Sequence, residues 1–290
     1  MAWESLSFES ARKLCLPDDA AEAPPPPPRI LLFQLIQGIG DLTTSFTRSH
    51  GDCTRGLVCF TMPEKDKVAC DLAQCFTIVL LLAERCNIDL PLSIQLKIKL
   101  NAKKYPAGIV KGSALKYDAY HATTGYGKGS KQVTTESGEE HLSAKIGQPW
   151  SVYDLEDLRV QLEQFAEQRN WAQFHTPRNL ALALCGEVGE LCELFQFKSE
   201  DLCLSGLLGW RNEERDKLSQ ELSDVCIYLL RLSDVCGVNL SAVMLNKYGV
   251  RSSSDGQPGQ STYCKGYPWL GGCLLLGLAA AVVLAGSKRC

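Results

Sequence analysis

The sequence predicts an all-α protein that is built from two related helical units. Apolar residues recur with helical spacing in two long blocks, residues 29–117 and 150–250. Alternating Val/Ile-rich segments bounded by tight turns, which would indicate strands, are missing from the sequence. The two blocks also align with each other, which indicates two copies of one unit that pack through equivalent faces as a pseudo-dimer.

The segments outside these blocks are expected to be tails and linkers. Residues 1–28 end in five consecutive prolines, so we expect a disordered leader. Residues 118–149 are rich in Gly, Ser, Thr and Lys without periodicity, which predicts a linker. A second linker at residues 251–268 precedes an apolar run at residues 269–286.

The apolar run has two interpretations. At about 1.5 Å per residue, a helix over residues 269–286 would span about 27 Å, which is enough for a bilayer core. It could therefore be a tail anchor in an intracellular membrane that leaves the rest of the chain in the cytosol. The alternative is a buried or disordered apolar tail. Either way, we expect a cytoplasmic protein, because the first residues are mixed and charged rather than an apolar signal peptide.

The amino-acid composition indicates which partners to expect and whether the cysteines are reduced. The formal net charge is -3, so the chain has no basic excess and a nucleic-acid partner is not expected. The 14 cysteines include no Cys-x-x-Cys pair and no His/Cys cluster with zinc spacing. Half of them lie within apolar helical patterns, and we expect free thiols in a reducing compartment.

Two pairs of acidic residues lie within apolar helical segments of the second block. The pairs are Glu187 with Glu190 and Glu221 with Asp224, and a spacing of three places both carboxylates of a pair on one helix face. Four carboxylates that converge from two packed helices repel one another unless a cation binds them. Oxygen ligands in this number suit Mg²⁺ or Mn²⁺, and these metals suit a phosphate substrate. The alternative interpretation is a solvated acidic stripe on each helix.

The first block has lost part of this pattern. Residues 28–46 align with residues 177–195, and residues 66–90 align with residues 216–240. Two of the four acidic positions are no longer acidic, because the aligned residues are Gly38, Asp41, Asp71 and Gln74. We expect metal binding in the first block to be weak or absent.

The second block resembles a known enzyme family over residues 154–228. The resemblance depends on three motifs in order, which are Trp171-x-x-Phe174-His175, Glu187-x-x-Glu190 and Glu221-x-x-Asp224 followed by Tyr228. Together these closely resemble the dCTP pyrophosphatase branch of the MazG-like nucleoside triphosphate pyrophosphohydrolases. The resemblance implies a four-helix unit that dimerises, and a reaction that cleaves a dNTP, such as dCTP, to the dNMP and pyrophosphate in nucleotide-pool cleaning.

The resemblance also implies roles for individual residues. The Mg²⁺ ligands would be Glu187, Glu190, Glu221 and Asp224. Glu187 or Glu190 would be the catalytic carboxylate that orients the attacking water. The residues that match nucleotide-contacting segments of the family, or a family lysine, are Trp171, Phe174, His175, Tyr228 and Lys247. Phe197 and Leu162 stand where dCTP-preferring members carry a tryptophan and a histidine, so cytosine is less well supported as the base.

The basic signature that ends the family unit is intact only in the first block. It comprises Lys97, Asn101, Lys104 and Tyr105, whereas the second block keeps only Lys247. We therefore predict a single composite site in which one copy supplies the acids and the other supplies the basic tail. The alternatives are a first copy that is only a scaffold, or a whole chain that binds nucleotides without turnover. Further homo-oligomerisation is left open.

Overall fold

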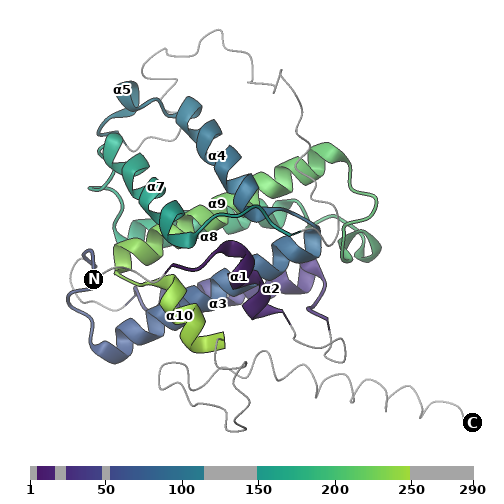
Figure 1. Cartoon of the computed structure of the whole chain (residues 1–290), viewed down its shortest axis with the longest axis horizontal. Helices are drawn as coiled ribbons and strands as arrows, with labels where there is room; N and C mark the ends of the chain where they lie inside the picture. The colour runs from purple at the N-terminus through teal and green to yellow at the C-terminus, as the bar shows by residue number, and fades with distance from the viewer. Residues whose placement is uncertain (1–4, 17–23, 48–52, 114–148, 249–290) are drawn as a thin grey trace, which may run out of the picture.

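The computed structural model describes residues 5–16, 24–47, 53–113 and 149–248, and within them every regular element is a helix (Figure 1). The all-α prediction is confirmed. Before residue 114 the elements are α1 (Phe8–Cys15), α2 (Pro28–Thr44), α3 (Met62–Cys86), α4 (Leu90–Lys104) and α5 (Ala107–Val110). After residue 148 they are α7 (Leu155–Gln168), α8 (Pro177–Glu193), the short 3₁₀ helix η1 (Glu200–Cys203), α9 (Asn212–Cys236) and α10 (Leu240–Tyr248).

The two longest helices, α3 and α9, begin and end in the same way. The side chain of Glu64 accepts a hydrogen bond from the N–H of Thr61 at 2.9 Å, and Glu214 accepts one from the N–H of Arg211 at 2.9 Å. Each bond satisfies a main-chain donor that the first helical turn leaves without a partner. Both helices end at a residue in the left-handed conformation, Asn87 in one and Gly237 in the other.

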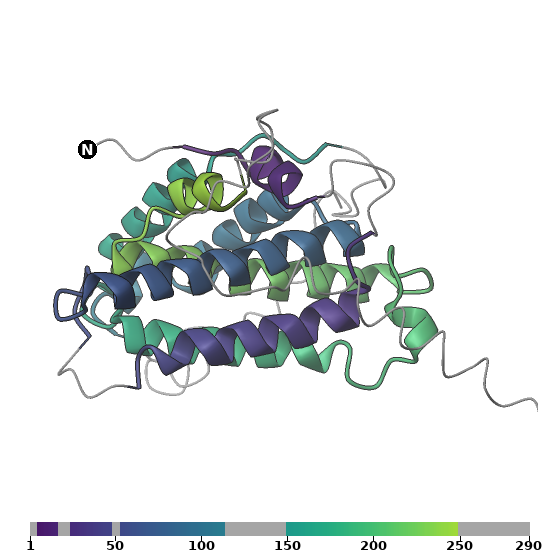
Figure 2. The ribbon, with the colours of Figure 1, turned by 90° about the horizontal axis from the view of Figure 1, so that it is seen from below.

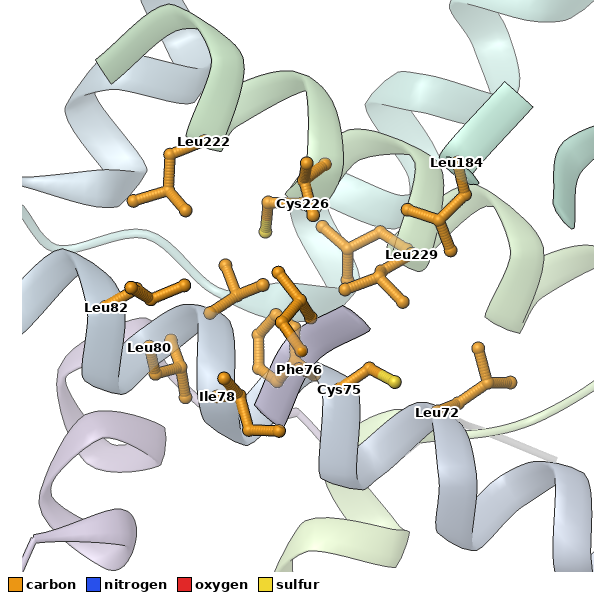
Figure 3. Packing of buried hydrophobic residues seen from close by; sticks show 14 of the residues in the cluster. Leu72, Cys75, Phe76, Ile78, Leu80, Leu82, Leu184, Leu222, Cys226 and Leu229 are labelled. Carbon is orange, nitrogen blue, oxygen red and sulfur yellow. The ribbon is translucent and has the colours of Figure 1, made fainter. Parts of the chain in front are cut away.

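The core lies between α3 and α9. Leu72 and Phe76 of α3 point toward Leu222 and Leu229 of α9, and all are nearly inaccessible to solvent (Figure 3). Fully burying a side chain of this kind contributes about 1.5–3 kcal/mol relative to leaving it exposed. α2 packs on α3 and α8 packs on α9, so the molecule consists of two helix pairs that meet through their long members (Figure 2).

The shorter helices cross between the two pairs. α4, which follows α3 in the sequence, packs on α9, whereas α10, which follows α9, packs on α3. α1 packs on α3 and α10, and α7 packs on α9 (Figure 1). The basic residues of α4 are therefore carried to the helix pair that holds the acidic residues.

Main-chain hydrogen bonds join the part of the chain before residue 114 to the part after residue 148 in matching pairs. The N–H of Phe8 donates to the carbonyl of Tyr153 at 3.0 Å, and the N–H of Leu155 donates to the carbonyl of Leu6 at 3.0 Å. These bonds tie the start of α1 to the start of α7.

A second pair of bonds lies at the ends of the long helices. The N–H of Gly56 donates to the carbonyl of Val235 at 2.8 Å, and the N–H of Gly206 donates to the carbonyl of Arg85 at 2.7 Å. Each loop before a long helix is thus bonded to the last turn of the other long helix.

The expectation of a disordered leader is wrong for residues 8–15, which form α1. The Ser7 side chain accepts a hydrogen bond from the N–H of Ser10 and caps the helix. Phe8 and Ala11 are fully buried, and the Phe8 ring lies 6.0 Å from that of Phe76 on α3. The helix is stable because its apolar face completes the core, a contact that its own short sequence does not reveal.

The expectation of free thiols is wrong for Cys70 on α3, which is in a disulfide.

Within the described residues no single helix is long and apolar enough to cross a membrane, and one bent pair, α9 with α10, meets that test by length and composition only. The two expected linkers, apart from residue 149, and the apolar run at residues 269–286 lie outside the described residues. The cytoplasmic location and the tail anchor therefore stay predictions.

Candidate active site

The four acidic residues of the second block meet between α8 and α9. Glu187 and Glu190 lie on α8, Glu221 and Asp224 lie on α9, and these two helices pack on each other. Carboxylate oxygens of Glu187, Glu190 and Glu221 lie within 4.8 Å of one another, a spacing that could hold a metal ion. The prediction that both pairs face one region is confirmed for these three residues.

The environment of these carboxylates disfavours their negative charge. Burial, followed by the negative charges of Asp224, Glu190 and Glu221, raises the pKa of Glu187 to about 7. Burial also raises the pKa of Glu221 and of Asp224, against the opposing effect of the Lys97 ammonium. A divalent cation would relieve this repulsion, which a solvated acidic stripe would not show.

A lysine from the first block contacts this acidic cluster. Lys97 lies on α4, and its Nζ is 2.5 Å from Oδ2 of Asp224. Only 13% and 14% of the two side chains are exposed, so the pair is largely shielded from solvent. The positive charge of Lys104, the last residue of α4, also opposes the rise in the pKa of Glu221 and of Asp224. Asn101 lies one helical turn after Lys97 and is half-buried.

Aromatic rings from both blocks form a wall beside the cluster. The rings of Tyr105 and Trp171 meet edge to face with centroids 5.5 Å apart. Phe165 and His175 lie on the same tryptophan, each with its ring centroid 6.1 Å from that of Trp171. Aromatic faces of this kind suit stacking of a nucleobase.

The segment after α4 is bonded to the segment between α7 and α8. Arg169 Nε donates to the carbonyl of Tyr105 at 2.8 Å, and the N–H of Gly112 donates to the carbonyl of Arg169 at 2.8 Å. Trp171 Nε1 donates to the carbonyl of Ser113 at 2.8 Å. These three bonds fix the end of the first block against the Arg169–Trp171 segment of the second block.

Three further predicted residues lie at different depths around the site. Tyr228 is half-buried one turn after Asp224 on α9, and burial followed by the charge of Glu187 raises its pKa. Phe174 is half-buried in the segment before α8. Phe197 lies beyond α8 and is 92% exposed, and among the described residues no ring contact joins it to the aromatic wall.

The structure does not bring Lys247 to the acidic cluster, contrary to the sequence-based prediction. Its Nζ donates to Oε1 of Gln74 at 2.7 Å, because α10 packs on α3 rather than on α9. Lys67 Nζ lies 2.6 Å from Oδ2 of Asp71 in the same region. The first-block positions that align with the acidic cluster are thus already contacted by ammonium groups of the protein.

Sequence reasoning missed Arg169 and Arg231. Arg169 holds the segment after α4, and Arg231 Nε donates to Nδ1 of His175 at 3.1 Å. Both side chains are almost fully buried. A signal was present for Arg231, since a charged residue stands within an apolar helical run where a buried position is expected.

Comparisons with known proteins agree with the resemblance to dCTP pyrophosphatases over part of the chain. No protein-family model matches the chain. The chain is 51% identical to dCTP pyrophosphatase 1 of Homo sapiens over 96 residues, which are 33% of this chain and 55% of the human protein. It is 52% identical to the proteins of the same name from Rattus norvegicus and Mus musculus, each over 93 residues.

The chain spans about half the length of the curated relatives it matches, since the aligned residues are 54% of the rat and mouse proteins. These relatives are enzymes by name. Their names describe a pyrophosphatase that acts on dCTP.

Proposed function

We propose that this protein is a Mg²⁺-dependent nucleoside triphosphate pyrophosphohydrolase that cleaves a dNTP similar to dCTP into the dNMP and pyrophosphate. The observation that carries this proposal is the group of three carboxylates within 4.8 Å of one another, with the Lys97–Asp224 pair beside it. Acidic groups that lie so close together at a partly exposed position suit a divalent cation with a polyphosphate bound to it. The names of the curated relatives support the same reaction.

The donor set fits Mg²⁺, and Mn²⁺ has the same preference for oxygen ligands. The ligands would be carboxylate oxygens of Glu187, Glu190, Glu221 and Asp224. When bound, the metal supplies neutralisation of the triphosphate charge and polarisation of the α-phosphorus. The raised pKa of Glu187, about 7, reflects the repulsion that such a charge would remove.

The residues of the chain bind the nucleotide and orient the water. Lys97 and Lys104 bring positive charge to the cluster, which suits the phosphates. Trp171 and Tyr105 offer an aromatic surface to the base. Glu187 or Glu190 would hold the attacking water and accept its proton, as the oxygen of that water bonds to the α-phosphorus and the bond to the bridging oxygen of pyrophosphate breaks.

We further propose that the two blocks are tandem copies of one unit and share a single composite site. The reciprocal packing of α4 on α9 and α10 on α3 supports this arrangement, as do the matching main-chain bonds between the blocks. Lys97 then supplies from the first copy a positive charge that the second copy lacks, because Lys247 is bonded to Gln74.

The test of the function is product analysis with a panel of dNTPs, with and without Mg²⁺. We expect Mg²⁺-dependent release of pyrophosphate and dNMP in equal amounts, and no dNDP. Release of single phosphate groups would contradict the proposed bond cleavage. Tight binding of a dNTP without any product would favour the alternative of a nucleotide-binding protein without turnover.

A further inference from the structure

A network of charged groups with a buried centre is bonded to His175 of the aromatic wall. It is centred on Asp234 of α9, which is 4% exposed. Its carboxylate accepts hydrogen bonds from Arg231 Nη1 and from Arg159 Nη1, the latter at 2.8 Å, and a longer one from Arg55 Nη2 at 3.3 Å. Three arginines and three carboxylates make up the network, namely Arg55, Arg159, Arg231, Glu156, Glu163 and Asp234.

The network ends on the imidazole of His175. Arg231 Nε donates to Nδ1 of His175 at 3.1 Å, while its Nη1 is bonded to Asp234. Arg231 is 4% exposed, so its guanidinium is fixed between these two partners. A guanidinium cannot accept a hydrogen bond, and therefore Nδ1 of His175 must be the unprotonated nitrogen.

The proton of the neutral imidazole is then on Nε2. Within the described ranges, His175 makes no other side-chain hydrogen bond, so the Nε2–H donor is available to a ligand. Burial, followed by the positive charge of Arg231, lowers the pKa of His175 to about 4. The imidazole is consequently neutral at physiological pH and has one defined donor.

A neutral imidazole donor suits the base or sugar of a nucleotide better than its triphosphate. Binding to a triphosphate oxygen would favour an imidazolium, which the neighbouring guanidinium disfavours. The His175 ring lies against Trp171, in the aromatic wall that suits a nucleobase. An uncharged acceptor, such as a base carbonyl or a sugar oxygen, is the matching partner.

We propose that Arg231 is a positioning residue that fixes His175 in its neutral Nε2–H form, so that His175 donates a hydrogen bond to an uncharged acceptor of the nucleoside. This inference rests on the proposed function only for the identity of the ligand. Arg231 acts through His175 and does not itself contact the nucleotide. Arg159 supports it indirectly, because it holds the Asp234 carboxylate that orients Arg231.

The test is a long-range ¹H–¹⁵N NMR correlation of the histidine side chains in the full chain, with the His175 signals assigned through His175→Gln. The chain has four histidines, so the spectrum is simple. In the wild-type protein we expect an unprotonated Nδ1 and a protonated Nε2 from pH 5.5 to pH 8. In Arg231→Leu we expect a mixture of both neutral forms and a titration that moves up from about 4 toward the ordinary 6.5.

Two further variants separate this role from a structural one. Arg55→Leu removes a guanidinium from the same Asp234 carboxylate, but Arg55 does not touch His175 and is half-exposed, so the imidazole signals should stay as in the wild type. Arg231→Lys keeps a cationic donor and should restore the Nε2–H form. A folded Arg231→Leu protein that keeps the wild-type imidazole signals would overturn the proposal.

Nucleotide binding gives the second readout. Adding a non-hydrolysable dCTP analogue with Mg²⁺ should shift the His175 Nε2–H signal, and Arg231→Leu should raise the Kd of the analogue about tenfold. An Nε2–H signal that does not move on binding, or an unchanged Kd, would contradict the proposal. Neither readout needs turnover, so a protein that binds the analogue without cleaving dCTP would overturn only the proposed function.

Discussion

The acidic cluster of the second block and the aligned region of the first block differ in what balances their charge. In the second block three carboxylates lie within 4.8 Å of one another, and Lys97 contacts the fourth acid. In the first block Lys67 contacts Asp71, and Lys247 contacts Gln74. The first region has fewer acids for a similar number of ammonium groups, so little negative charge is left for a metal ion.

Packing reinforces this difference. At Gly38, which aligns with Glu187, an added Cβ would lie 3.1 Å from Sγ of Cys75. Cys75 is fully buried, and its sulfur therefore fills part of the space that a side chain at position 38 would need. Under the proposed tandem repeat, the first region has lost both its acids and the space for them, whereas its basic helix α4 serves the acidic cluster of the second block.

The largest expected difference is in kcat, between variants of the aligned acids Glu190 and Asp41. Glu190→Gln should lower kcat by roughly three orders of magnitude, as expected if a metal ligand contributes about 4 kcal/mol to the transition state. Asp41→Asn, at the aligned position of the first block, should leave kcat within about twofold. Steady-state kinetics with dCTP and Mg²⁺ would measure both. A similar loss in the two variants would show that the first region also takes part in the reaction.

The two lysines provide the next comparison. Lys97→Met removes the charge beside Asp224 and should lower kcat/KM about 100-fold, since charge-assisted contacts to phosphate are among the strongest. Lys247→Met keeps the aliphatic length and should leave kcat/KM within about threefold. It should instead destabilise the fold by about 1 kcal/mol through the lost bond to Gln74. Urea denaturation and kinetics on both variants separate these effects, and equal kinetic losses would contradict the asymmetry.

The third comparison is between the acidic cluster with the ionisable Glu187 and the cluster with a neutral glutamine in its place. Because the folded-state pKa of Glu187 is raised to about 7 from 4.5, the folded protein binds a proton between these values that the unfolded chain does not. In the absence of divalent metal, stability should therefore fall as pH rises from 4.5 to 7. Glu187→Gln should flatten this part of the profile, and thermal unfolding across pH would measure it. An unchanged slope would mean that Glu187 is not the group responsible.

The smallest expected effect is a gain of function in the first region. Gly38→Glu and Gln74→Asp would restore the four acids, and Cys75→Ala would remove the sulfur that an added side chain would meet. We expect the triple variant to bind additional Mn²⁺, with lower affinity than the second block, because Lys67 and Lys247 compete for the acids. Equilibrium dialysis would count the bound metal. If the stoichiometry does not rise, the acids alone do not explain the difference between the two regions.

The sequence was sufficient for the parts of the structure that depend on local pattern. Helical periodicity identified the all-α class, and the spacing of three placed Glu187 with Glu190 and Glu221 with Asp224 on single helix faces. It was also sufficient to link Lys97 to the acids, because the basic signature and the acidic signature are each complete in only one block.

The rest depends on packing between distant segments. α1 was missed because the proline run dominated the interpretation of residues 1–28, although Ser7-Phe8-Glu9 and Arg12 resemble the start of α7. Lys247 was misplaced because nothing local determines which long helix α10 packs on. The bond between Arg231 and His175 joins residues far apart in the chain, so no spacing rule could reveal it.

The central claim is that the acidic cluster of the second block binds the divalent metal and the aligned region of the first does not. Titration of Mn²⁺ followed by electron paramagnetic resonance, in the presence of a non-hydrolysable dCTP analogue, tests it most directly. We expect tight Mn²⁺ binding to disappear in Glu221→Gln and to persist in Asp71→Asn, its aligned counterpart. Equal binding in both variants, or loss of binding only in Asp71→Asn, would contradict it.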